Sequence, residues 1–117
     1  MAVTATQTAL HLKAVAEAAR QRGQARADRL LTGCVRARSV LVDQYGARRV
    51  WLFGSLAAGE PTSESDVDLA VEGLSGGAYF TALTDLMVLF GGPVDLVRLE
   101  DAPASLRERI LAEGREL

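Results

Sequence analysis

The sequence predicts an α/β (α+β) domain, a small mixed β-sheet of three to four strands flanked by helices and preceded by an N-terminal helical extension. Three observations predict this class. Apolar residues in the first half of the chain recur every three or four positions, as in helices. In the second half, short β-prone runs alternate with helical periods, and glycines separate these segments. The 117 residues suffice for one domain of this kind.

The first helix is expected over residues 4–22. Its apolar stripe is mostly alanine and buries little area: Ala5, Ala9, Leu12, Ala16 and Ala19. Such a stripe suits weak packing, or contact with a partner or a second copy in a homo-oligomer. Gly23 is expected to interrupt the helix. Residues 1–23 are therefore predicted to form the helical extension, and residues 24–117 the main domain.

A second helix is expected over residues 24–45, and Gly46 is a suitable residue to end it. Its predicted buried stripe consists of Leu30, Cys34, Ala37 and Leu41. Gly33 within it costs about 1 kcal/mol relative to alanine, which weakens the prediction of a continuous helix. The period then changes, and residues 49–53 form an apolar, β-prone run that predicts a buried strand.

Two more strands are predicted, over residues 67–71 and 94–99, with a helix over 79–90 between them. In the first of these strands, Val67, Leu69 and Val71 share one face, and Asp66, Asp68 and Ala70 the other. Pro103 suits the first turn of a last helix. Its apolar positions are Leu106, Ile110 and Leu117.

The net charge of −2 hides a division along the chain. Residues 1–50 hold nine basic and three acidic side chains, whereas residues 51–117 hold four basic and twelve acidic ones. The basic half suits a polyanion or an acidic partner, or is simply the solvated face of arginine-rich helices. The overall pI of about 5.4 favours a protein partner or a nucleotide over a nucleic acid.

Several functional classes are excluded by composition. No run of about 20 apolar residues is present, so no membrane span is expected. The first residues lack a cationic segment followed by an apolar core, so a cytoplasmic protein is expected. A single cysteine, Cys34, and a single histidine, His11, exclude an intrachain disulfide and His- or Cys-rich zinc sites.

The stretch from Leu52 to Leu69 carries the chemistry. Gly54-Ser55 ends a predicted strand and offers backbone N–H groups and a hydroxyl to a phosphate, helped by the positive end of any helix that begins there. Ten residues later come Asp66 and Asp68, which project from one face of the next strand, and Asp95 lies on a later strand. The alternative reading of these acids is that they are ordinary strand-end residues, solvated or paired with arginine.

Electrostatics decides between these readings if the strands that carry Asp68 and Asp95 are neighbours. Two carboxylates about 5 Å apart repel by roughly 3 kcal/mol at an effective dielectric constant near 20, so a cation is expected among them. Hard oxygen ligands suit Mg²⁺ or Mn²⁺. The Gly-Ser pair at a matching distance and the third acid favour a metal site that serves phosphoryl transfer.

Gly54-Ser55, ten residues, Asp66-Val-Asp68 and then Asp95 on a later strand together resemble the nucleotidyltransferase superfamily related to DNA polymerase β. The small size is similar to that of the minimal nucleotidyltransferases, which act as antitoxins beside helical HEPN toxins. The resemblance implies a nucleotidyltransferase fold and transfer of AMP from ATP to a hydroxyl, such as that of a tyrosine of the toxin.

The resemblance also implies roles for individual residues. Gly54 and Ser55 would contact the outer phosphates of ATP. Ser65, read from its place directly before Asp66, is a further nucleotide-binding candidate whose hydroxyl can orient that carboxylate, or a simple turn residue. Asp66 and Asp68 would hold Mg²⁺ or Mn²⁺. Asp95 would be the third metal ligand and would lie next to the acceptor hydroxyl.

One position departs from the pattern. Members of this superfamily often have arginine where this chain has Ala58, so a cation near the triphosphate is missing. Arg48, Arg49 or Arg98 are candidates to replace it. The departure keeps open an inactive antitoxin that neutralises its toxin by binding alone. A third reading, transfer to a small molecule or to RNA, is weaker because those enzymes usually carry an additional domain.

Overall fold

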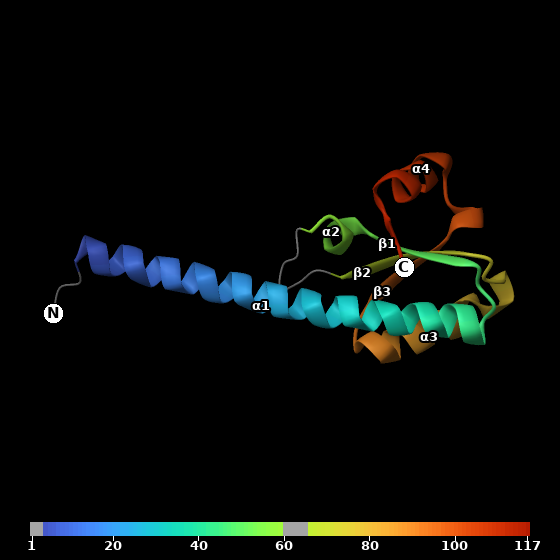
Figure 1. Ribbon diagram of the computed structural model, residues 1–117, viewed down its shortest axis with the longest axis horizontal. Coiled ribbons are helices and arrows are strands. Elements are labelled where there is room, and N and C mark those ends of the chain that lie inside the picture. Colours follow the sequence, from blue (N-terminus) through green and yellow to red (C-terminus); the bar gives the residue numbers. More distant parts are fainter. Residues whose placement is uncertain (1–3, 60–65) are drawn as a thin grey trace.

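A computed structural model describes residues 4–59 and 66–117 of the chain (Figure 1). The first third of the chain forms one long helix, α1 (Ala5–Ser39). It begins with a capping box between Thr4 and Gln7 and runs into a π-helical turn, Val40–Gln44. The predicted break at Gly23 is wrong. Good helix formers surround this glycine, and they tolerate its cost of about 1 kcal/mol. Gly46 follows the π-helical turn with a φ of 73°, in agreement with the predicted stop.

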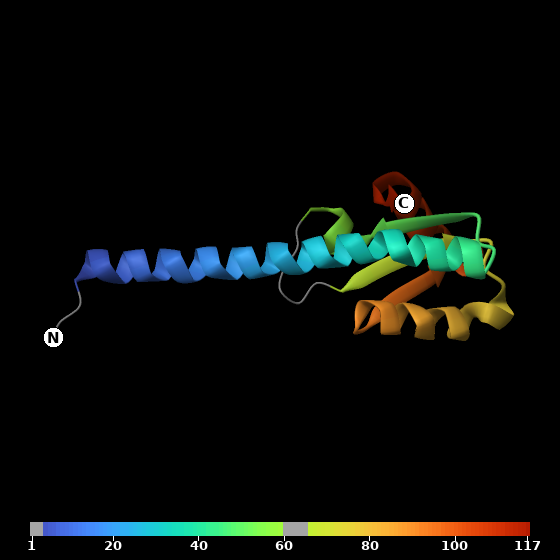
Figure 2. The ribbon, with the colours of Figure 1, turned by 60° about the horizontal axis from the view of Figure 1, so that its bottom comes forward.

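The two halves of α1 have different environments. Before Gly23, no described residue of the helix is buried, and this half projects away from the sheet and its other helices (Figures 1 and 2). The longest axis of the whole molecule is therefore 65 Å. From Gly23 onward the helix packs on the sheet. The predicted stripe of Leu30, Cys34, Ala37 and Leu41 is buried, as expected.

A four-stranded sheet forms the centre of the domain, with the order β3-β2-β1-β4. The strands are β1 (Arg49–Phe53), β2 (Val67–Glu72), β3 (Val94–Arg98) and β4 (Arg115–Glu116). β1 runs antiparallel to β2 and β4, whereas β2 and β3 are parallel. The three predicted strands are confirmed. Leu117, however, lies beyond the last helix, because the chain turns at Gly114 and pairs with β1.

Helices cover both faces of this sheet. They are α2 (Gly54–Ala57), α3 (Tyr79–Phe90) and α4 (Ala104–Glu113), with short 3₁₀ turns at Gly76–Ala78 and Leu99–Asp101. α1 and α3 lie on one face and α4 on the other (Figures 1 and 2). α1 and α3 approach closely at Gly33, where an added Cβ would lie 2.6 Å from the Phe90 ring.

The two faces bury two separate cores, and β2 contributes to both. Val67, Leu69 and Val71 pack toward α1 and α3, whereas Ala70 joins Trp51 and Ile110 of α4 in the smaller core. The predicted alternation along β2 is therefore confirmed, and Trp51 is a packing residue. Asp68 shares the α4 face with Ala70, which places its carboxyl between the sheet and α4.

Within the described ranges, none of the helices combines the length and apolar character needed to cross a lipid bilayer.

Candidate active site

Parallel pairing of β2 with β3 brings two of the three predicted acids together. Asp68 is the direct register partner of Asp95, so both side chains leave the same face of the sheet. Asp66 immediately precedes β2 and is exposed, as is Asp95. Asp68 is partly buried. The sequence alone did not establish that the strands carrying Asp68 and Asp95 are neighbours. The register of β2 and β3 shows that they are.

The environment of Asp68 disfavours its charged form. Burial raises the pKa of Asp68 from 3.8 to about 6, together with a hydrogen bond shared with Asp95 and the negative charges of Asp95 and Asp66. At neutral pH the carboxylates therefore carry more negative charge than their surroundings stabilise. This is the electrostatic condition under which a bound cation is favourable.

The donor set fits a hard divalent cation, because it consists of carboxylate oxygens with excess negative charge. Across residues 4–59 and 66–117, no three acidic, histidine or cysteine side chains converge in a metal-binding arrangement. The acids meet instead as the pair Asp68–Asp95, with Asp66 beside them. Coordination of one ion by all three acids would therefore require a change in their arrangement.

Gly54 lies directly against Asp68, one member of this pair. Its φ of 79° falls in the left-handed region, and a Cβ added to it would lie 2.1 Å from Oδ2 of Asp68. Only glycine satisfies both conditions. Ser55 follows in the single turn of α2, so the predicted Gly-Ser element sits next to the acids, at the end of β1.

A cavity of about 450 Å³ joins these elements to α4. It is lined by Phe53, Gly54, Ser55, Ala58, Asp68, Leu106, Arg109, Ile110 and Glu113. This volume is typical of a small-molecule site. The sequence interpretation missed Arg109. The helical spacing of Leu106, Arg109, Ile110 and Glu113 was a usable signal, but it does not reveal which part of the sheet the helix covers.

The arginines named as substitutes for the missing cation lie elsewhere. Arg48 directly precedes β1 and pairs with Glu72, and Arg49 begins β1 and pairs with Glu116. Both lie at the end of β1 opposite Gly54. Arg98 ends β3 and pairs with Asp101. None of the three lines the cavity at Gly54. Ser65, the further nucleotide-binding candidate, lies outside the described residues.

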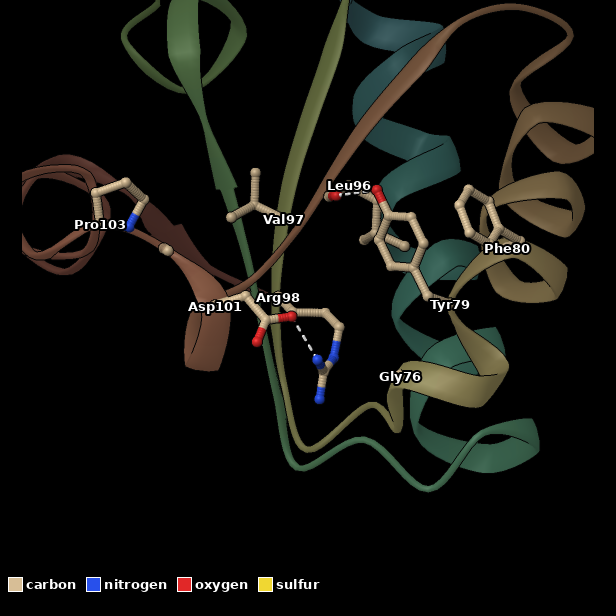
Figure 3. Close-up of a pocket in the computed structure, with 9 residues that line it drawn as sticks. Gly76, Tyr79, Phe80, Leu96, Val97, Arg98, Asp101 and Pro103 are labelled. Atoms are coloured by element: carbon tan, nitrogen blue, oxygen red, sulfur yellow. Dashed lines mark hydrogen bonds and ion pairs between the residues drawn. The ribbon is translucent and has the colours of Figure 1, made fainter.

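Arg98 belongs to a second cavity, of about 430 Å³, beside the far end of β3 (Figure 3). Here the Tyr79 hydroxyl donates a hydrogen bond to the Leu96 carbonyl at 2.6 Å, and Asp101 neutralises Arg98. Gly76 borders this cavity, but Asp101 is the single acidic residue among the described residues that line it, and Arg98 pairs with it. The first cavity, with Asp68 and Gly54, is therefore the candidate active site.

Known proteins share this architecture. A solved structure provisionally identified as a minimal nucleotidyltransferase is 35% identical, with 75% of this chain and 95% of that chain covered and a TM-score of 0.63. A mutant of the toxin–antitoxin MntA–HpeT is 29% identical over 70% of this chain and 68% of that chain, with a TM-score of 0.61. A toxin–antitoxin structure with AMP-PNP is 26% identical over 69% of each chain, with a TM-score of 0.60.

A Methanocaldococcus jannaschii protein provisionally named a protein adenylyltransferase is 49% identical over 35 residues, 30% of this chain. That match spans 35% of the relative's length. The family model described as polymerase beta, nucleotidyltransferase matches residues 37–117, which include all four strands and the cavity at Gly54. The chain therefore belongs to the polymerase beta nucleotidyltransferase family.

Proposed function

We propose that this chain is a metal-dependent adenylyltransferase, an antitoxin that transfers AMP from ATP to a hydroxyl of a partner toxin. The observation that carries the proposal is the register pairing of Asp68 with Asp95 beside Gly54. Paired carboxylates next to an exposed Gly-Ser turn suit a nucleotide triphosphate with its divalent cation. Family membership and the AMP-PNP in a related toxin–antitoxin structure support the same substrate.

Each residue has a distinct role in this proposal. Asp66, Asp68 and Asp95 hold Mg²⁺ or Mn²⁺, which offsets the negative charge of the triphosphate. Gly54 and Ser55 bind the outer phosphates. Asp95 also lies next to the acceptor and receives its hydroxyl proton. The acceptor oxygen forms a bond to the α-phosphorus, the bond from that phosphorus to the bridging oxygen breaks, and pyrophosphate leaves.

A protein acceptor fits the position of Asp95. β3 is an edge strand, and Asp95 is exposed on it, so a bulky acceptor can reach the carboxylate. Two of the solved relatives are toxin–antitoxin structures. We propose a tyrosine of a HEPN-type toxin as the acceptor, as the family resemblance implies. Residues 1–23 are then an added helical segment and residues 24–117 the transferase domain.

Mass spectrometry of the toxin tests this proposal. The chain is co-expressed with a candidate HEPN-type toxin from the same genome, and the toxin is expected to gain AMP on tyrosine. Asp68→Asn should abolish the modification, whereas Asp43→Asn, which removes an exposed carboxylate outside the site, should not. An unmodified toxin, or equal modification with wild type and Asp68→Asn, contradicts transfer by this site.

Ala58 favours one alternative, an antitoxin that neutralises its toxin by binding alone, because a cation common in the family is missing there. The Asp66→Asn/Asp68→Asn double variant distinguishes the two functions. Cells rescued from the toxin by a folded double variant would support neutralisation by binding. Loss of rescue, with toxin binding retained in a pull-down, would support adenylylation.

A further inference from the structure

The candidate active site contains a positive charge that the sequence motif does not include. Arg109 lies on α4, in the wall of the cavity that faces Gly54, Ser55 and Asp68. The chain separates Arg109 from Gly54 by 55 positions, and only the packing of α4 on the sheet brings them to one cavity. α2, at the end of β1, and α4 both border this cavity (Figure 1).

The charges around the cavity require a cation if a triphosphate is to bind. Among the described residues that line it, Asp68 and Glu113 are acidic, and Arg109 alone is basic. α2 has four residues, too few for a substantial helix dipole. A divalent ion near the acids neutralises only part of the charge of a triphosphate. A guanidinium group presents donors that match phosphate oxygens in pairs.

Arg109 is also free to bind an anion. It is exposed, and the described residues include no carboxylate at ion-pair distance from it. Glu113, one helical turn further on, is the acidic residue of α4 that lines the same cavity as Arg109. Arg48, Arg49 and Arg98, by contrast, are engaged in ion pairs away from this cavity.

We infer that Arg109 binds the phosphate chain of the nucleotide and supplies, from α4, the positive charge that Ala58 does not supply from the loop after α2. This inference rests on the proposed function and assigns a binding residue to the same site. Ala58 and Arg109 line one cavity, so a cation at either position can reach the same phosphates.

Calorimetric titration of the full chain with AMP-PNP in Mg²⁺, and separately with adenosine, tests the inference. Arg109→Ala is expected to weaken AMP-PNP binding about tenfold or more, equivalent to ~1.4 kcal/mol. Adenosine binding should change by less than about twofold, because adenosine carries no phosphate for the arginine to bind. Adding Ala58→Arg to Arg109→Ala should restore AMP-PNP binding.

Arg107→Ala is the matched control, because it removes the same charge from the same helix at a position that does not line the cavity. Equal AMP-PNP affinities for Arg109→Ala and Arg107→Ala would overturn the inference while leaving the proposed function intact. Equal losses for AMP-PNP and adenosine would also overturn it, since they would indicate a reshaped cavity. Absence of AMP-PNP binding by the wild-type chain would overturn both.

Discussion

Replacing Asp68 with asparagine is expected to stabilise the metal-free protein at neutral pH. Asparagine has nearly the same shape as aspartate, but it cannot ionise. In the wild-type fold, burial and the neighbouring Asp95 and Asp66 raise the pKa of Asp68 to about 6, from 3.8. The folded protein therefore holds the proton more tightly than the unfolded chain does. The charged form destabilises the fold.

The magnitude follows from this shift. A change of about two pKa units corresponds to roughly 3 kcal/mol if fully expressed. Asp68 is only partly buried, so solvent screening reduces the expected effect to about 1 kcal/mol. The size of the penalty depends on pH: it is absent below about pH 3.8, develops between about pH 3.8 and 6, and is complete above about pH 6.

Urea unfolding followed by circular dichroism, in EDTA at pH 4 and at pH 8, measures this effect. Asp68→Asn should exceed the wild type in unfolding free energy by about 1 kcal/mol at pH 8 and by little at pH 4. Asp43→Asn is the control for loss of an exposed acid. Mg²⁺ should stabilise the wild type more than Asp68→Asn. A stability difference that does not depend on pH, or a less stable Asp68→Asn at pH 8, would refute the electrostatic reasoning.

Three further predictions concern other parts of the chain. Gly54→Ala should lower the unfolding free energy, measured by urea unfolding, by about 1–3 kcal/mol, because alanine is strained at a positive φ and its Cβ clashes with Asp68. The same variant should abolish AMP-PNP binding. Full binding would contradict the role of this glycine. Deletion of residues 1–22 should leave the urea midpoint unchanged, because the described residues before Gly23 are not buried. Light scattering and toxin titration then test whether this half of α1 mediates association, which unchanged mass and affinity would exclude. Burial raises the pKa of Cys34 to about 11, so the thiol should react with a disulfide reagent only on unfolding; rapid reaction in the native protein would disprove its burial.

Local sequence patterns predicted most of the secondary structure and the chemistry of the acids. The alternation along β2 determined that Asp68 faces away from Val67 and Leu69, because successive side chains of a strand point to opposite faces. The Gly-Ser pair after a predicted strand indicated a phosphate-binding turn at Gly54. Each of these signals involves only a few neighbouring residues, so it can be recognised without knowledge of the tertiary structure.

Local patterns gave wrong or missing predictions where long-range packing outweighs a small local energetic preference. Gly23 was expected to end a helix, yet its cost is about 1 kcal/mol, and the surrounding helix formers and its own buried position outweigh it. β4 was not expected, because two residues after a glycine carry no recognisable strand period. Only their pairing with Trp51 and Leu52 defines them as a strand.

The sequence by itself determined which side chains this protein has for phosphate and metal chemistry, and on which faces of their own strands they lie. Only the tertiary structure decided that Asp95 is the register partner of Asp68 and that Arg109 lines their cavity. The physical reason is that strand order and helix docking are set by burial of apolar faces across the whole domain. A strand or helix carries no local record of the partner against which it packs.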